Sequence, residues 1–187
     1  MTPAGGTGGP AASVASRRPG DRRADALRMR YSGVFGACPL PIPVEAIAEE
    51  LLGLTVLTGS ALPVSGLLIV PRREIWVEAS DTPMRRRFTV AHEIGHWVCH
   101  RDGAPAVCHL ESGAPPQRDP REREANVFAA ELLMPEAAVR AVHARDPSLT
   151  ALVAAFAVSH EAMSWRLFNL GIGPRPERED AGAGLVG

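Results

Sequence analysis

Apolar residues recur every three to four positions over much of the chain, which predicts helices. The clearest helix begins after the capping side chains of Asp81-Thr82, has Pro83 in its first turn and runs to about His100. A second begins near Pro120, reads REREANVFAAELLM and ends before Pro135. The same repeat predicts further helices over residues 43–52, 136–144 and 148–170, the last range holding two helices around Ala157-Val158-Ser159.

Between the helices, short runs of β-branched and aromatic residues predict strands. They cover residues 55–57, 66–70 and 74–78, and Pro71-Arg72-Arg73 is expected to turn the last two into a hairpin. Residues 101–120 are rich in glycine and proline and are expected to form a loop. Together these elements predict an α+β fold, mostly helical with a short β-sheet.

The ends of the chain lack any such pattern. Residues 1–22 are expected to be a disordered tail leading towards a helix, residues 23–145 the main domain, residues 146–172 a helical pair and residues 173–187 a flexible tail. The hydrophobic fraction of 45% suffices for a core, and a net charge of -1 argues against electrostatic attraction to nucleic acid or membranes. Three cysteines and no apolar leader or span fit a cytoplasmic protein.

The chemistry of the chain centres on His92-Glu93-Ile94-Gly95-His96, an H-E-x-x-H motif within the helix predicted after Pro83. Histidines four residues apart on a helix can direct both imidazoles at one metal ion. Glu93 is placed beside them to act as the general base. A divalent ion with three protein ligands and an open position lowers the pKa of water towards ~7, the basis of a metallopeptidase.

The third metal ligand is expected on the helix that follows Pro120. Three carboxylates there are candidates, and the residues alone do not choose among Glu122, Glu124 and Glu131. His100 continues the stripe of His92 and His96, but three successive turns span about 11 Å, too long for all three to bind one ion. A supporting or surface role is therefore expected for His100.

Three motifs in this order resemble the ImmA/IrrE-type metallopeptidases. After H-E-I-G-H comes E-A-N-x-F-A-A-x-L-L-M-P from Glu124 to Pro135, and then V-S-x-x-A-M-x-x-R-L-x-x-L-G from Val158 to Gly171. The resemblance covers roughly residues 30–172. It implies a zincin-like domain with His92, His96 and Glu124 as metal ligands and Glu93 as catalytic base. It also suggests that the strand 74–78 is a sheet edge that pairs with an extended substrate.

The resemblance implies a metal-dependent endopeptidase that cleaves a helix-turn-helix transcriptional repressor in a stress, phage or mobile-element circuit. The expected metal is Zn²⁺, with Mn²⁺ or another divalent ion as alternatives. The alternative function is a non-proteolytic, metal-binding regulator that binds a repressor or DNA. Residues 159–170 could be a recognition helix, but one arginine and one glutamate there argue against direct DNA binding.

Overall fold

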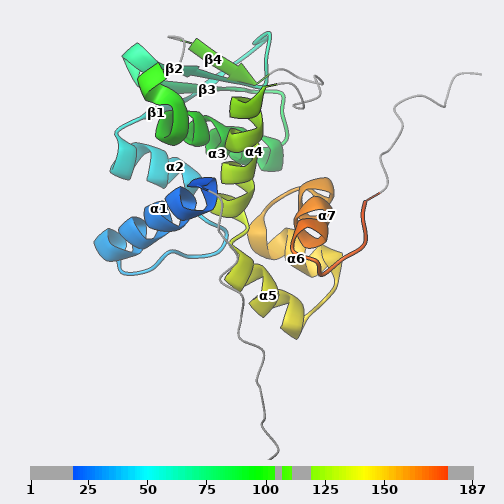
Figure 1. The fold of residues 1–187 in the computed structure, drawn as a ribbon. Helices are drawn as coiled ribbons and strands as arrows, with labels where there is room; N and C mark the ends of the chain where they lie inside the picture. Colours follow the sequence, from blue (N-terminus) through cyan, green and yellow to red (C-terminus); the bar gives the residue numbers. More distant parts are fainter. Residues whose placement is uncertain (1–18, 104–106, 111–118, 177–187) are drawn as a thin grey trace, which may run out of the picture.

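The computed structural model describes residues 19–103, 107–110 and 119–176, and it confirms the predicted α+β fold (Figure 1). A four-stranded sheet lies at one end of the molecule and helices make up the rest. The strands are β1 (Thr55–Gly59), β2 (Gly66–Ile69), β3 (Glu74–Glu78) and β4 (Val107–Leu110), in the spatial order β1-β3-β2-β4. The predicted hairpin is confirmed, since β2 and β3 pair antiparallel.

The position of β3 corrects one expectation. We expected this strand to be a sheet edge, but it lies between β1, with which it pairs parallel, and β2. Its alternating burial, with Ile75 and Val77 buried, suits a central strand packed on a helix. The strand β4 was missed, because its short segment lies within a stretch rich in turn residues. The edges of the sheet are therefore β1 and β4.

Two helices form the centre of the molecule. They are α3 (Pro83–His100), capped by the Thr82 side chain, and α4 (Pro120–Leu133), capped by Asp119, both close to their predicted bounds. α3 packs against the sheet on one side and against α4 on the other. A Cβ atom at Gly95 would lie 3.1 Å from Cα of Ala125, so the glycine allows the two helix backbones to approach closely.

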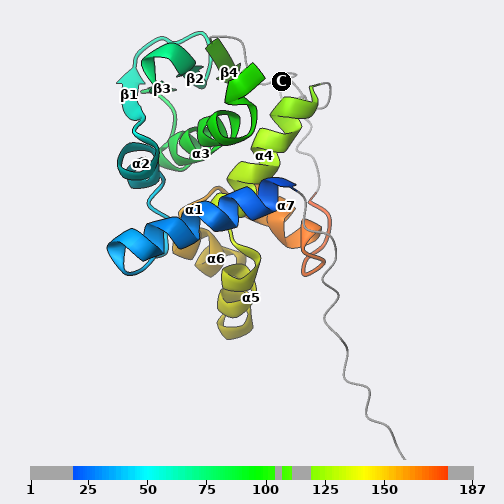
Figure 2. The same cartoon turned by 60° about the vertical axis from the view of Figure 1, so that its left-hand side comes forward.

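The remaining helices surround this pair. The helix α1 (Pro19–Phe35) begins within the predicted tail and packs across α4 (Figure 2). The predicted helix near residues 43–52 is present as α2 (Val44–Ala46) continued by the π-helical turn η1 (Ile47–Leu51). Single 3-10 turns, η2 (Val70–Arg72) and η3 (Arg101–Gly103), follow β2 and α3. No helix in the described ranges is long and apolar enough to cross a membrane.

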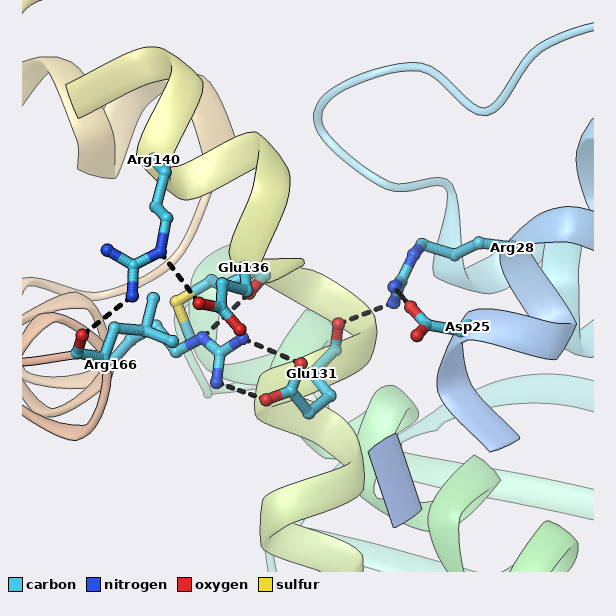
Figure 3. Close-up of polar contacts among 8 residues, drawn as sticks. Asp25, Arg28, Glu131, Glu136, Arg140 and Arg166 are labelled. Carbon is cyan, nitrogen blue, oxygen red and sulfur yellow. Dashed lines mark hydrogen bonds and ion pairs between the residues drawn. The ribbon is translucent and has the colours of Figure 1, made fainter. Parts of the chain in front are cut away.

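Beyond α4 the chain forms α5 (Glu136–Arg145), α6 (Leu149–Phe156) and α7 (His160–Asn169). This confirms the predicted helical pair around Ala157. Polar contacts join α7 to α4, and Arg140 of α5 donates to the carbonyl of Leu170 at the end of α7 (Figure 3). The Arg166 guanidinium on α7 forms an ion pair with both carboxylate oxygens of Glu131 and donates to the Met134 carbonyl at 2.9 Å. From the other side, Arg28 of α1 donates to the Glu131 carbonyl at 2.6 Å.

Candidate metal centre

The motif histidines lie on the face of α3 that meets α4. His92 and His96 are 0% and 2% exposed, and their Nε2 atoms lie 3.0 Å apart. The i, i+4 spacing stacks the two imidazoles on one side of the helix. The neighbouring residues Ile94 and Trp97 are buried, which holds this part of α3 in the core.

A carboxylate from the first turn of α4 completes the group. Glu122 places Oε2 at 3.1 Å from Nε2 of His92 and Oε1 at 3.1 Å from Nε2 of His96. The ligand atoms of these three residues all lie within 4.8 Å of one another. Among the described residues they form the one group of three or more His, Cys, Asp or Glu side chains arranged to hold a metal ion.

The structure does not bring the ligand expected from the resemblance, Glu124, to the two motif histidines. Its Oε2 lies 3.1 Å from Nε2 of His100, and its Oε1 lies 3.3 Å from Nη1 of Arg23. Both carboxylates face α3, but Glu122 reaches His92 and His96, whereas Glu124, two residues further along α4, reaches His100, one turn beyond His96. The structure therefore brings Glu122, and not Glu124, to the two motif histidines. The third candidate, Glu131, pairs with Arg166 instead.

Glu93 lies in the same region but is held differently from Glu122. Its side chain is fully buried, and neither carboxylate oxygen has a hydrogen-bond partner. Burial raises the pKa of Glu93 well above its usual range, and the nearby negative charge of Glu122 raises it further. A Cβ atom at Gly66, the first residue of β2, would lie 2.2 Å from Cγ2 of Thr89 and 2.9 Å from Oε1 of Glu93, so a larger residue there would displace both side chains.

The contacts of the two motif histidines indicate which ring nitrogens are available. Nδ1 of His92 lies 3.0 Å from Oδ1 of Asn126, which can only accept, so Nδ1 donates its hydrogen and Nε2 keeps its lone pair. Burial lowers the pKa of His92, which favours this neutral form. Metal-binding histidines commonly have such a partner on their other nitrogen. Asn126 was not predicted as a site residue, although its place in the E-A-N motif, one turn after Glu122, was a usable signal.

These residues fit a divalent cation. Burial alone would raise the pKa of the Glu122 carboxyl, but its contacts with His92 and His96 reverse the direction and lower the pKa far below its usual range. Two imidazole nitrogens and an ionised carboxylate are the donor set of many zinc sites. The two carboxyl oxygens of Glu93 are buried and have no hydrogen-bond partner, and a bound cation with its water would supply one.

The fold and this group of side chains together define a metallopeptidase-type α+β domain. The family model for the IrrE N-terminal-like domain (Peptidase_M78) matches residues 49–168, and the chain belongs to this family. The predicted resemblance to the ImmA/IrrE group is thereby confirmed.

Other comparisons are more distant. No curated protein matches the chain. A solved structure described as a Mycobacterium tuberculosis transcriptional regulator is similar in fold, with a TM-score of 0.55 and 17% sequence identity. The match covers 78% of this chain and 46% of the regulator's chain, so this chain corresponds to less than half of that protein. At this identity the likeness concerns the fold alone.

Proposed function

We propose that the protein is a metal-dependent endopeptidase in which His92, His96 and Glu122 bind the metal ion and Glu93 is the general base. The observation that carries this proposal is the convergence of the three ligand side chains within 4.8 Å beside a buried carboxylate without a partner. A purely structural metal site needs no base, and structural zinc sites commonly use four protein ligands.

A divalent ion held by these ligands supplies Lewis acidity, which acidifies water and polarises a peptide carbonyl. Glu93 then accepts a proton from the attacking water and returns it to the leaving amine. Asn126 holds the His92 ring in the orientation that directs Nε2 at Glu122.

The proposal for the substrate class rests on the family resemblance and not on any residue of the site. We propose a transcriptional repressor of the helix-turn-helix type as the protein substrate. The outer edge of β4 is our candidate for pairing with an extended segment of this substrate. This strand is an edge strand of the sheet, pairs with β2 and contacts α3, the helix that carries the motif histidines. Zn²⁺ suits a His2Glu ligand set, although Mn²⁺ or iron can replace it in sites of this type.

The second candidate function is a regulator that binds metal and a repressor without cleaving it. The fold likeness to a protein described as a transcriptional regulator favours keeping it. The two candidates make different demands on Glu93. A binding protein keeps its function without this carboxylate, whereas a peptidase does not.

The test is cleavage of a co-expressed candidate repressor by the wild-type protein and by Glu93→Gln, with the metal content of both measured. The peptidase proposal expects both proteins to hold metal and only the wild type to cleave. Equal cleavage by Glu93→Gln would remove Glu93 as the base. Tight repressor binding by both proteins, with full metal content and no cleavage, would replace the peptidase with the regulator.

A further inference from the structure

A chain of polar contacts leads from the motif histidines to the surface. Nδ1 of His96 lies 3.2 Å from Nδ1 of His100, and Nε2 of His100 lies 3.1 Å from Oε2 of Glu124. The last contact in this series is made by Arg23 of α1, whose Nη1 lies 3.3 Å from Oε1 of Glu124. These contacts connect three helices, α1, α3 and α4.

We propose that Arg23, Glu124 and His100 are positioning residues that fix the orientation and tautomer of His96. The inference rests on the metal centre proposed above. A carboxylate oxygen only accepts hydrogen bonds, and Oε1 of Glu124 accepts from Arg23, so Nε2 of His100 carries the hydrogen in its contact with Oε2 of Glu124. In neutral His100 this leaves a lone pair on Nδ1.

The tautomer of His100 determines that of His96. Because Nδ1 of His100 is an acceptor, Nδ1 of His96 donates its hydrogen to it. Nε2 of His96 is then left with its lone pair, directed at Glu122 and His92. In the same way, Oδ1 of Asn126 accepts the hydrogen of Nδ1 of His92 and leaves the lone pair on Nε2 of His92. Arg23, Glu124 and His100, which together form a relay of contacts, direct the lone pair of His96 towards Glu122, and Asn126 directs that of His92. Two imidazole lone pairs and a carboxylate thus face one another, an arrangement of acceptors that is favourable around a cation.

The side chains of the relay become more exposed from His96 outwards to Arg23. The side chain of His96 is 3% exposed and that of His100 8% exposed, so their contact is shielded from water. Glu124 and Arg23 are 37% and 44% exposed, which keeps the two charged groups solvated where they pair. Glu124 thus acts on the metal centre through His100, in contrast to the direct contact of Glu122.

The first test is Zn²⁺ affinity, measured by competition with a chelator on the full chain. Loss of a residue that supports a metal ligand commonly weakens binding by about 10–100-fold, and we expect this for His100→Leu. In His100→Gln the amide oxygen can accept from Nδ1 of His96, so this variant is expected to recover most of the affinity. The control is His160→Gln, a change of an exposed histidine at the start of α7, which should leave the affinity unchanged.

A second measurement does not depend on affinity. In the Zn²⁺-loaded wild type, NMR should show a hydrogen on Nδ1 of His96 that exchanges slowly with water. This signal should broaden or disappear in His100→Leu and persist in His100→Gln. Failure of the Leu variant to fold would leave the wild-type signal as the deciding observation. If Nδ1 of His96 carries no protected hydrogen, or His100→Leu binds Zn²⁺ as tightly as the wild type, the relay is overturned.

The variant Glu124→Gln separates the relay from direct ligation. A glutamine at this position keeps an oxygen that can accept from His100, so the relay expects at most about a 10-fold loss of Zn²⁺ affinity. Complete loss of binding would make Glu124 a ligand and overturn its role as a positioning residue. Zn²⁺ binding that survives in Glu122→Gln would remove the proposed metal centre and the relay together, whereas intact binding in His100→Leu removes only the relay.

Discussion

Both ends of α4 carry carboxylates, but the partners of these carboxylates differ. Near the C-terminus Glu131 is paired through both oxygens with Arg166. Near the N-terminus Glu122 meets two imidazoles and lies close to Glu93, whose buried oxygens have no partner. A buried polar group costs free energy unless it is hydrogen-bonded, so a protein that leaves the Glu93 carboxyl without a partner gains something from it other than stability. The ion pair at the C-terminal end of α4 contributes to stability, whereas the N-terminal end carries the proposed metal ligand.

The largest expected effect comes from changing the same residue type at each end. Glu122→Gln removes a proposed ligand and should weaken Zn²⁺ binding by more than about 100-fold, beyond the usual effect of changing a supporting residue. Glu131→Gln should leave Zn²⁺ affinity within about 3-fold of the wild type, because its side chain faces Arg166 instead of the histidines. Chelator competition on both folded variants measures the difference. Equal losses in the two variants would contradict the division of α4.

The next effect concerns stability at the other end. Arg166→Met removes the cation that pairs with Glu131 and leaves the Met134 carbonyl without this donor. Breaking a buried ion pair commonly costs about 3–5 kcal/mol, and we expect about 3 kcal/mol because Glu131 keeps 17% exposure. Urea unfolding of the metal-free protein measures this change in the free energy of unfolding.

A matched control for Arg166 lies on α5. Arg140 pairs with Glu136 at 2.8 Å, but the two side chains are 50% and 48% exposed. An exposed pair contributes little, so Arg140→Met should lower the free energy of unfolding by less than about 1 kcal/mol. A similar loss in both arginine variants would mean that burial does not distinguish the two pairs. The double variant Arg166→Met/Glu131→Gln should recover part of the loss, because no unpaired charge remains.

The sequence predicted most elements of the fold because their signals are local. The capping residue Thr82, the first-turn Pro83 and the hydrophobic repeat together define α3 to the residue. The order of strands in the sheet depends on pairing between distant segments, which no local pattern encodes. For this reason β3 was expected at the edge although it lies in the centre, and β4 was not predicted.

The site shows the same division between local and long-range information. The spacing of His92 and His96 predicts their common direction, and the structure confirms that they lie together. The choice between Glu122 and Glu124 depends on the rotation of α4 about its axis relative to α3, which is set by packing at Gly95 and Ala125. The carboxylate that enters the site is therefore a property of the helix interface, and the two-residue difference cannot be read from the motif alone.

The smallest predicted effect tests whether the helical end can be stabilised without changing the metal centre. Ala157, which ends α6, has a φ of 50°, a left-handed conformation that costs about 1 kcal/mol for a residue with a Cβ atom. Ala157→Gly should therefore raise the free energy of unfolding by about 0.5–1 kcal/mol. Ala154 lies within α6, where glycine is unfavourable, so Ala154→Gly is expected to lower the free energy of unfolding by about the same amount.

Urea unfolding of both alanine variants measures these shifts, and chelator competition measures their Zn²⁺ affinity. Stabilisation by Ala157→Gly with unchanged affinity would show that the helical pair and the metal centre are energetically separable. A change in affinity that follows stability in both variants would instead show that the helical pair and the metal centre are coupled, with α4, which contacts both, as the connecting element. In that case the ion pair of Arg166 with Glu131 would influence the position of Glu122 at the other end of the same helix.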